Sequence, residues 1–193
     1  MIDPFSRGRH QGIHFLVLLL LGAILAGAAE LPYGGWIQIP ILSLVWWWLK
    51  QEHFASVKKL FLSGLTFGLG YFVIGLWWIY ISLHDVGGMN IALSCMAVFL
   101  LSAYMAIYFS LATLTISLVQ PSRFTGLFLA ASWVVMEFLR GYIFTGFPWM
   151  GLAESQITMC RSTHRAFGFG VFLQTTILAF AVHQHKACGV PQL

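Results

Sequence analysis

The sequence predicts an all-α membrane protein, a polytopic bundle of five to six transmembrane helices whose amino terminus faces the cytoplasm. Hydrophobic residues make up 59% of the 193-residue chain and charged residues only 8%, and the mean hydropathy is +0.83. A soluble domain carries about 25% charged residues. This chain therefore has too few charges to cover the surface of a water-soluble globule, and a lipid bilayer is the solvent that its composition indicates.

The individual helices follow from apolar runs, since about 20 helical residues cross the hydrocarbon core of a bilayer. The predicted segments are 13–29, 36–49, 60–83, 89–119, 124–144 and, more weakly, 166–182. The first run resembles a secretory signal, because basic residues precede it and small residues end it, but the apolar runs that follow favour an uncleaved helix. In the third run, Gly64, Gly68 and Gly75 lie near one helical face, which predicts the close approach of a neighbouring helix.

The positions of the basic residues predict the orientation of the bundle. One set of loop ends carries most of them, namely Arg7, Arg9, Lys50, Lys58, Lys59 and Arg123. Among lysines and arginines, only Arg140 lies near the opposite ends of the first five runs. Because basic loops stay in the cytoplasm, the loops 31–35, 84–88 and 146–156 are expected outside. The basic residues form no stripe with interleaved aromatics, so the net charge of +4 does not predict a nucleic-acid partner.

The fifth run ends in two ionisable residues, Glu137 and Arg140, and a turn follows it. Intramembrane charges are costly and usually paired. Residues three positions apart share a helical face, so the two side chains predict either a stabilising ion pair or a substrate-facing site. In the turn, Phe147, Pro148 and Trp149 form a rigid apolar surface that suits contact with lipid chains, or an aromatic belt that anchors the protein.

A second aromatic cluster contains Trp78 and Tyr80 and precedes the adjacent residues His84 and Asp85. Adjacent side chains rarely point at each other, so a polar interfacial turn is favoured over an acid-base dyad. No motif identifies a nucleophile. The irregularly spaced His183, His185, Cys188 and Cys160 do not predict a metal site. We therefore expect no cofactor and no metal.

Three stretches of sequence carry a family resemblance. The stretches WIYISLHDVGGM, SAYMAIYFSL and EFLRGYIFTGFPWMGLAESQ resemble the amino-terminal membrane region of bacterial apolipoprotein N-acyltransferases. The TGFPW block with the preceding E-x-L-R-G is the most specific of these matches. The resemblance covers residues 31–156.

The resemblance implies a multi-pass enzyme of the bacterial inner membrane that completes lipoprotein maturation. Its partners are membrane lipids, a phospholipid acyl donor and a diacylated apolipoprotein, whose amino-terminal cysteine receives the acyl chain. The family reacts by a ping-pong mechanism through a thioester, on a Glu-Lys-Cys triad in a periplasmic nitrilase-like domain. By the same resemblance, the residues that shape the lateral lipid entrance are Phe147, Pro148, Trp149, Glu137, Arg140, Trp78 and Tyr80.

The sequence departs from this pattern after Gln156. Residues 1–156 form the expected membrane region, and 157–193 form a divergent tail with the weak sixth helix. The nitrilase-like domain is absent from the sequence, which suggests a truncated or frameshifted gene. We therefore assign no catalytic residue and expect the chain to be inactive alone, as an enzyme fragment or a product without activity. The alternative is a small polytopic transporter or membrane assembly subunit, with Glu137 and Arg140 lining a polar path.

Overall fold

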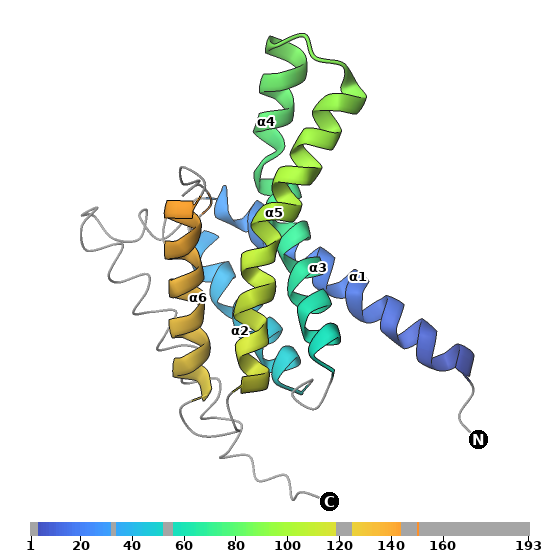
Figure 1. Cartoon of the computed structure of the whole chain (residues 1–193), viewed down its shortest axis with the longest axis vertical. Coiled ribbons are helices and arrows are strands. Elements are labelled where there is room, and N and C mark those ends of the chain that lie inside the picture. Colours follow the sequence, from blue (N-terminus) through green and yellow to red (C-terminus); the bar gives the residue numbers. More distant parts are fainter. Residues whose placement is uncertain (1–3, 32–33, 52–55, 119–124, 144–149, 151–193) are drawn as a thin grey trace, which may run out of the picture.

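The computed structural model describes residues 4–31, 34–51, 56–118, 125–143 and 150, which form a bundle of helices joined by short connections (Figure 1). The helices are α1 (Pro4–Ala29), α2 (Gly34–Gln51), α3 (Val57–Gly75), α4 (Trp77–Ile81), α5 (Ile91–Leu118) and α6 (Thr125–Tyr142), with a turn of π-helix, η1 (Ser82–Val86), after α4. These residues contain no strand. The predicted all-α fold is therefore confirmed.

The described residues contain three helices that are long and apolar enough to cross a membrane, at Gln11–Ala29, Val57–Gly75 and Ile91–Thr115. A shorter apolar helix spans Trp36–Leu49. The first, second, fourth and fifth predicted segments each correspond to one helix, whereas the third is interrupted. Its helix ends at Gly75, and the chain continues through Leu76 into α4 and η1. Glycine has a low helix propensity, which favours a break at this point. The predicted segment 166–182 lies outside the described residues.

Helix α3 lies at the centre of the bundle and packs against α5 on one side and α1 on another. A Cβ atom on Gly64 would meet Ser110 and Thr113 of α5, and one on Gly68 would meet Ala106. The predicted close approach of a neighbouring helix is confirmed for these two glycines. It is wrong for Gly75, because Gly75 instead faces the side chain of Met150, which follows α6.

The α1–α3 contact depends on two glycines that the sequence pattern did not single out. A Cβ atom on Gly70 would overlap the carbonyl group of Leu19, and one on Gly22 would overlap the carbonyl oxygen of Phe67. The two backbones therefore touch directly. Small residues permit such an approach, which dispersion forces favour where lipid offers no hydrophobic drive for helix association.

Near the start of α3, side-chain hydrogen bonds reinforce its packing against both α5 and α1. The hydroxyl of Thr113 lies 3.1 Å from the carbonyl oxygen of Leu60 and 2.8 Å from that of Ser110. The Nε2 atom of the buried His14, on α1, lies 2.9 Å from the hydroxyl oxygen of Ser63 on α3. Because a bilayer interior supplies no water to buried polar groups, these pairs satisfy one another within the bundle.

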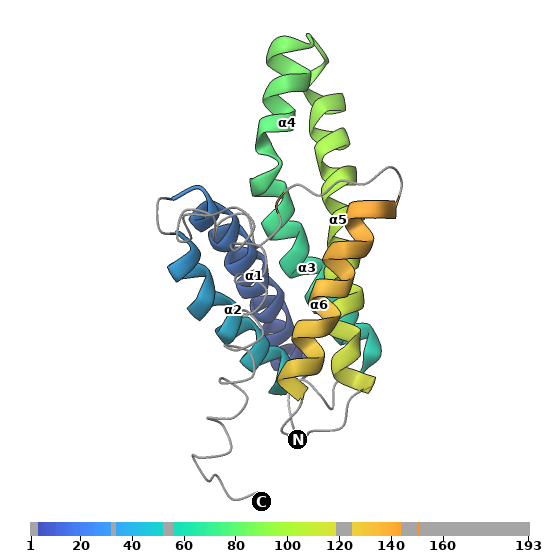
Figure 2. The same cartoon turned by 90° about the vertical axis from the view of Figure 1, so that its left-hand side faces the viewer.

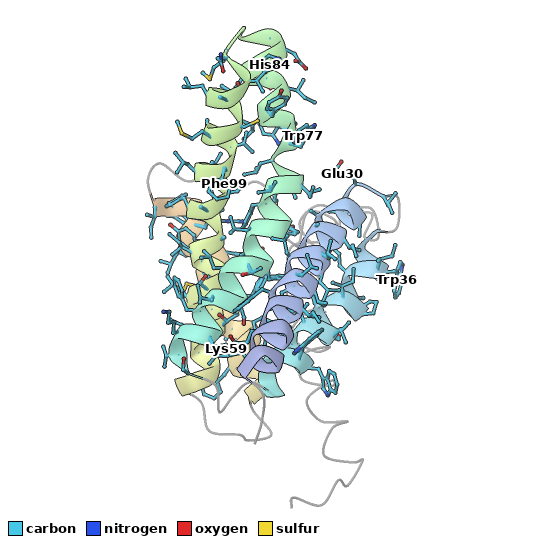
Figure 3. The ribbon with its side chains drawn as sticks, turned by 90° about the vertical axis from the view of Figure 1, so that its right-hand side faces the viewer. Glu30, Trp36, Lys59, Trp77, His84 and Phe99 are labelled. Carbon is cyan, nitrogen blue, oxygen red and sulfur yellow. The ribbon has the colours of Figure 1, made fainter. Side chains whose placement is uncertain are left out.

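Helix α4, η1 and the start of α5 form a hairpin that extends beyond the other helices (Figures 1 and 2). The helical path from Val57 to Val86 rises about 45 Å at 1.5 Å per residue, whereas the hydrocarbon core is about 30 Å thick. Lys59 lies near one end of the bundle and His84 near the opposite end (Figure 3). This path is therefore longer than the hydrocarbon core is thick.

The backbone contact between α1 and α3 predicts that Gly70→Ala destabilises the bundle. The new methyl group would overlap the backbone of Leu19, and overpacking of this kind costs about 1–3 kcal/mol. Gly27→Ala is the matched control, because a Cβ atom on Gly27 meets nothing within 4 Å. We expect the melting temperature in detergent to fall for Gly70→Ala and to hold or rise for Gly27→Ala. Equal melting temperatures for the two variants would contradict the packing.

Candidate functional site

A small pocket lies between α5 and α6 and contains both predicted charged residues. Its lining residues are Tyr108, Phe109, Ala112, Trp133, Met136, Glu137 and Arg140. The cavity volume is about 10 Å³, which is roughly the space that one water molecule requires. Glu137 and Arg140 thus face the same space, as their spacing on one helix implies.

Arg140 brings a full positive charge into this pocket. Its side chain is 3% exposed, and arginine stays protonated in proteins. The guanidinium carbon lies 5.1 Å from the ring centroid of Phe72 on α3, and Nε has no hydrogen-bond partner among the described residues. Arg140 also lies in the last turn of α6, where a cation interacts favourably with the helix dipole. The cation–π contact and the dipole stabilise the charge but leave the buried N–H group unsatisfied.

Aromatic side chains form most of the remaining wall. The rings of Phe109 and Trp133 meet edge-to-face with their centroids 4.2 Å apart. The hydroxyl oxygens of Tyr104 and Tyr108 lie 2.8 Å apart, one turn from each other on α5. Sequence analysis did not single out these four residues. The spacing of the two tyrosines could have indicated their pairing, but the place of Tyr108 beside Arg140 depends on how α5 packs against α6.

The predicted residues Trp78 and Tyr80 lie on the hairpin, on a different element from Glu137 and Arg140. Trp78 is 45% exposed. The ring of Tyr80 stacks on that of Trp77 at 4.8 Å and lies 5.4 Å from that of His84, and Figure 3 shows Trp77 and His84 on this hairpin. The structure therefore divides the predicted set between the α5–α6 pocket and an exposed aromatic cluster.

His84 stabilises the hairpin tip. Its Nδ1 donates to the carbonyl oxygen of Met89 at 2.8 Å, since a carbonyl can only accept. Its Nε2 lies 3.9 Å from a carboxylate oxygen of Asp85, which is too long for a hydrogen bond. Gly88 follows with a φ of 65°, a conformation that glycine adopts without strain. This geometry supports the predicted polar turn over an acid-base dyad.

The described residues do not include the predicted turn Phe147, Pro148 and Trp149. They also do not include the four residues considered above as metal ligands, Cys160, His183, His185 and Cys188. Within the described part of the chain, no three His, Cys, Asp or Glu side chains gather in a cluster that could hold a metal.

Met150, which directly follows Trp149, is fixed against α3. Its carbonyl oxygen accepts a hydrogen bond of 3.0 Å from the hydroxyl of Tyr71, and its side chain packs on Gly75. Its φ of 64° is unusual for a residue other than glycine. Sequence reasoning missed this contact, because nothing in local spacing relates residues so far apart in the chain.

The Met150 contact predicts that paired cysteines at Gly75 and Met150 form a disulfide on mild oxidation. A Cβ atom on Gly75 lies 3.4 Å from Cγ of Met150, the position that Sγ of a cysteine takes, so the two cysteine side chains would lie within reach of each other. The background carries Cys95→Ser, Cys160→Ser and Cys188→Ser, and loss of maleimide labelling measures the bond. Gly27→Cys with Met150→Cys is the control pair, because a Cβ atom on Gly27 has no neighbour within 4 Å. Equal protection in both pairs would contradict the contact.

Comparison with known proteins identifies the family. The model of the apolipoprotein N-acyltransferase N-terminal domain matches residues 22–183. An apolipoprotein N-acyltransferase of Methylococcus capsulatus is 37% identical over 171 residues, which cover 85% of this chain and 33% of that protein. The corresponding protein of Chromobacterium violaceum is 38% identical over 163 residues, covering 81% of this chain and 31% of the relative.

A third relative, from Coxiella burnetii, is 34% identical over 174 residues, which cover 86% of this chain and 34% of that protein. The chain thus spans about a third of the length of the curated relatives that it matches. The matched region contains every described helix from α2 to α6 and the pocket that holds Glu137 and Arg140. The resemblance seen in the sequence is confirmed, and the chain belongs to the apolipoprotein N-acyltransferase family, whose members are acyltransferases.

Proposed function

We propose that this chain is the membrane-embedded amino-terminal part of an apolipoprotein N-acyltransferase in the bacterial inner membrane. The complete enzyme transfers an acyl chain from a phospholipid to the amino-terminal cysteine of a diacylated apolipoprotein. The family match over residues 22–183 is the observation that carries this proposal. The apolar helices and the charged pocket with aromatic walls support a role in holding lipid.

The proposed topology is multi-pass, with a cytoplasmic amino terminus and the hairpin tip outside. Lys59 and His84 lie near opposite ends of the bundle (Figure 3). Basic residues favour the cytoplasmic side, which supports placing the Lys59 end inside. Trp77 and Trp78 are about half exposed on the hairpin, as expected for residues at the outer interface. On this side a lipoprotein substrate would meet the enzyme.

The proposed role of this region is to receive lipid. Large apolar side chains cover the lipid-accessible faces of the outer half of α5 and of α6, namely Ile91, Leu93, Met96, Phe99, Leu100, Val135, Phe138 and Tyr142. The lateral entrance is proposed to include Trp78 and Tyr80 on the hairpin, Glu137 and Arg140 in the pocket, and the turn Phe147, Pro148 and Trp149. The transporter alternative requires a polar path, but the pocket beside Arg140 has mainly apolar and aromatic walls and room for about one water.

A chimera tests the proposed function. Residues 22–183 replace the matching segment of the Methylococcus capsulatus relative, and the chimera is expressed in cells depleted of their own enzyme. We expect lipoproteins to regain their third acyl chain, measured by mass spectrometry of amino-terminal lipopeptides, because the matched regions share a family. The unaltered relative is the positive control. A chimera that inserts into the membrane but leaves lipoproteins diacylated would contradict the proposal.

A second experiment tests whether the acyl-carrying thiol lies outside the described residues. The described part of the chain contains one free cysteine, the exposed Cys95 on α5. A thiol becomes a nucleophile when a base or positive charge activates it, and no cluster of three His, Cys, Asp or Glu surrounds it among the described residues. We expect no thioester on Cys95 after incubation of the 193-residue chain with a radiolabelled phospholipid. Cys95→Ser gives the background, and a hydroxylamine-sensitive label present only with Cys95 would contradict the expectation.

A further inference from the structure

We propose that the Arg140 pocket binds the phosphate group of a phospholipid headgroup. This inference rests on the proposed function and specifies which part of the lipid the pocket recognises. The pocket lies between α5 and α6, with the guanidinium group over Phe72 and the hydroxyl-bearing Tyr108 in its wall.

The first argument is electrostatic. Arg140 is 97% buried, since only 3% of it is exposed, and it carries a permanent charge. The face of Phe72 attracts this charge but accepts no strong hydrogen bond, and Nε has no partner among the described residues. A buried charge without complete hydrogen bonding is strongly unfavourable. An anionic oxygen would supply the missing acceptor in a charge-assisted hydrogen bond.

The second argument concerns shape. A guanidinium group presents a planar fork of donors that matches the oxygens of a phosphate. The cavity volume of about 10 Å³ accommodates about one oxygen-sized group. It is too small for an acyl chain. We therefore place one phosphate oxygen inside the pocket, with the rest of the headgroup at its mouth.

The third argument is depth. Phe72, which lies beneath the guanidinium group, precedes Trp77 by five residues, about 7.5 Å at the helical rise per residue, with the break at Leu76 between them. Tryptophans mark the membrane interface, so Arg140 lies little more than one helical turn inside it. Helix α6 ends at Tyr142, and the hairpin rises past this end (Figure 2). A headgroup of the outer leaflet can reach this depth by local thinning of the bilayer.

The face of α6 away from the pocket carries two exposed aromatic side chains. Phe138 and Tyr142, on the outward side of α6, are 62% and 71% exposed. Their ring centroids lie 4.5 Å apart. Residues two positions from Arg140 lie on the opposite face of the helix, so this aromatic pair faces away from the pocket that Arg140 lines.

Native mass spectrometry of the purified 193-residue chain in detergent tests the proposal. The probe is dioleoyl phosphatidylethanolamine, and dioleoylglycerol, which lacks the phosphate, is the comparison lipid. We expect Arg140→Gln to weaken phospholipid retention about 10-fold or more, the effect of losing a hydrogen bond to a charged group. Lys58→Gln is the matched control, because it removes the same charge from an exposed position at the opposite end of the bundle. Equal retention by Arg140→Gln and Lys58→Gln would overturn the proposal.

Glu137→Gln separates recognition of phosphate from general damage to the fold. It removes a negative charge from the wall of the same pocket, so we expect phospholipid retention to rise. Damage to the fold would instead lower phospholipid retention. If Glu137→Gln lowers retention as much as Arg140→Gln does, that result would count against the proposal.

Added inorganic phosphate identifies the source of the anion. Displacement of the lipid by equimolar inorganic phosphate would assign the pocket to free phosphate and overturn the lipid assignment.

The outcome is independent of the chimera experiment. Lipid retention is measured on the chain itself and needs no acyl transfer. If lipid retention depends on the phosphate but the chimera is inactive, the phosphate-binding proposal is supported and the proposed function is contradicted. If the chimera is active but lipid retention does not change in Arg140→Gln, the proposed function is supported and the phosphate-binding proposal is contradicted.

Discussion

The close packing of α3 against α1 and α5 is the constraint on which the rest of the structure depends. Gly70 meets the backbone of α1, and Gly64 and Gly68 meet α5, so three helices approach more closely than larger side chains would allow. In lipid, such contacts and buried hydrogen bonds hold helices together, because burial from water contributes little. These contacts fix the direction of α3 at its centre. That direction determines where the side chains along the outer half of α3 lie.

Helix α3 links the two parts of the candidate site. Phe72 supplies the aromatic face under Arg140, while its neighbour Tyr71 binds the carbonyl oxygen of Met150. Directly after α3, the chain continues through Leu76 and α4 into the hairpin that carries the exposed aromatic residues. One central helix therefore positions the charged pocket, the residue that follows the TGFPW block and the aromatic hairpin. This arrangement suits the proposed role of the region in receiving lipid.

Local sequence pattern predicted the helices because each one depends on a property of consecutive residues. Apolar runs gave α1, α2, α5 and α6 in their observed order, and the charge spacing on α6 correctly indicated that Glu137 and Arg140 face one space. The pattern did not predict the break at Leu76. The pattern predicted that Gly75 contacts a neighbouring helix, whereas Gly75 contacts Met150, a residue far away in the chain.

The sequence by itself determined the membrane class, the helix order, the expected orientation and the family, because composition, run length, charge placement and the motif around TGFPW are all properties of the chain read in order. Only the tertiary structure decided that Arg140 lies on Phe72, that Tyr108 and Trp133 share its pocket, and that Trp78 and Tyr80 belong to a separate hairpin. The physical reason is that these contacts depend on how close the glycines bring α1, α3 and α5, and on how α6 then packs on α5. Those distances are set between helices, and beyond the spacing of Gly64 and Gly68 they leave no periodic signal within any one of them.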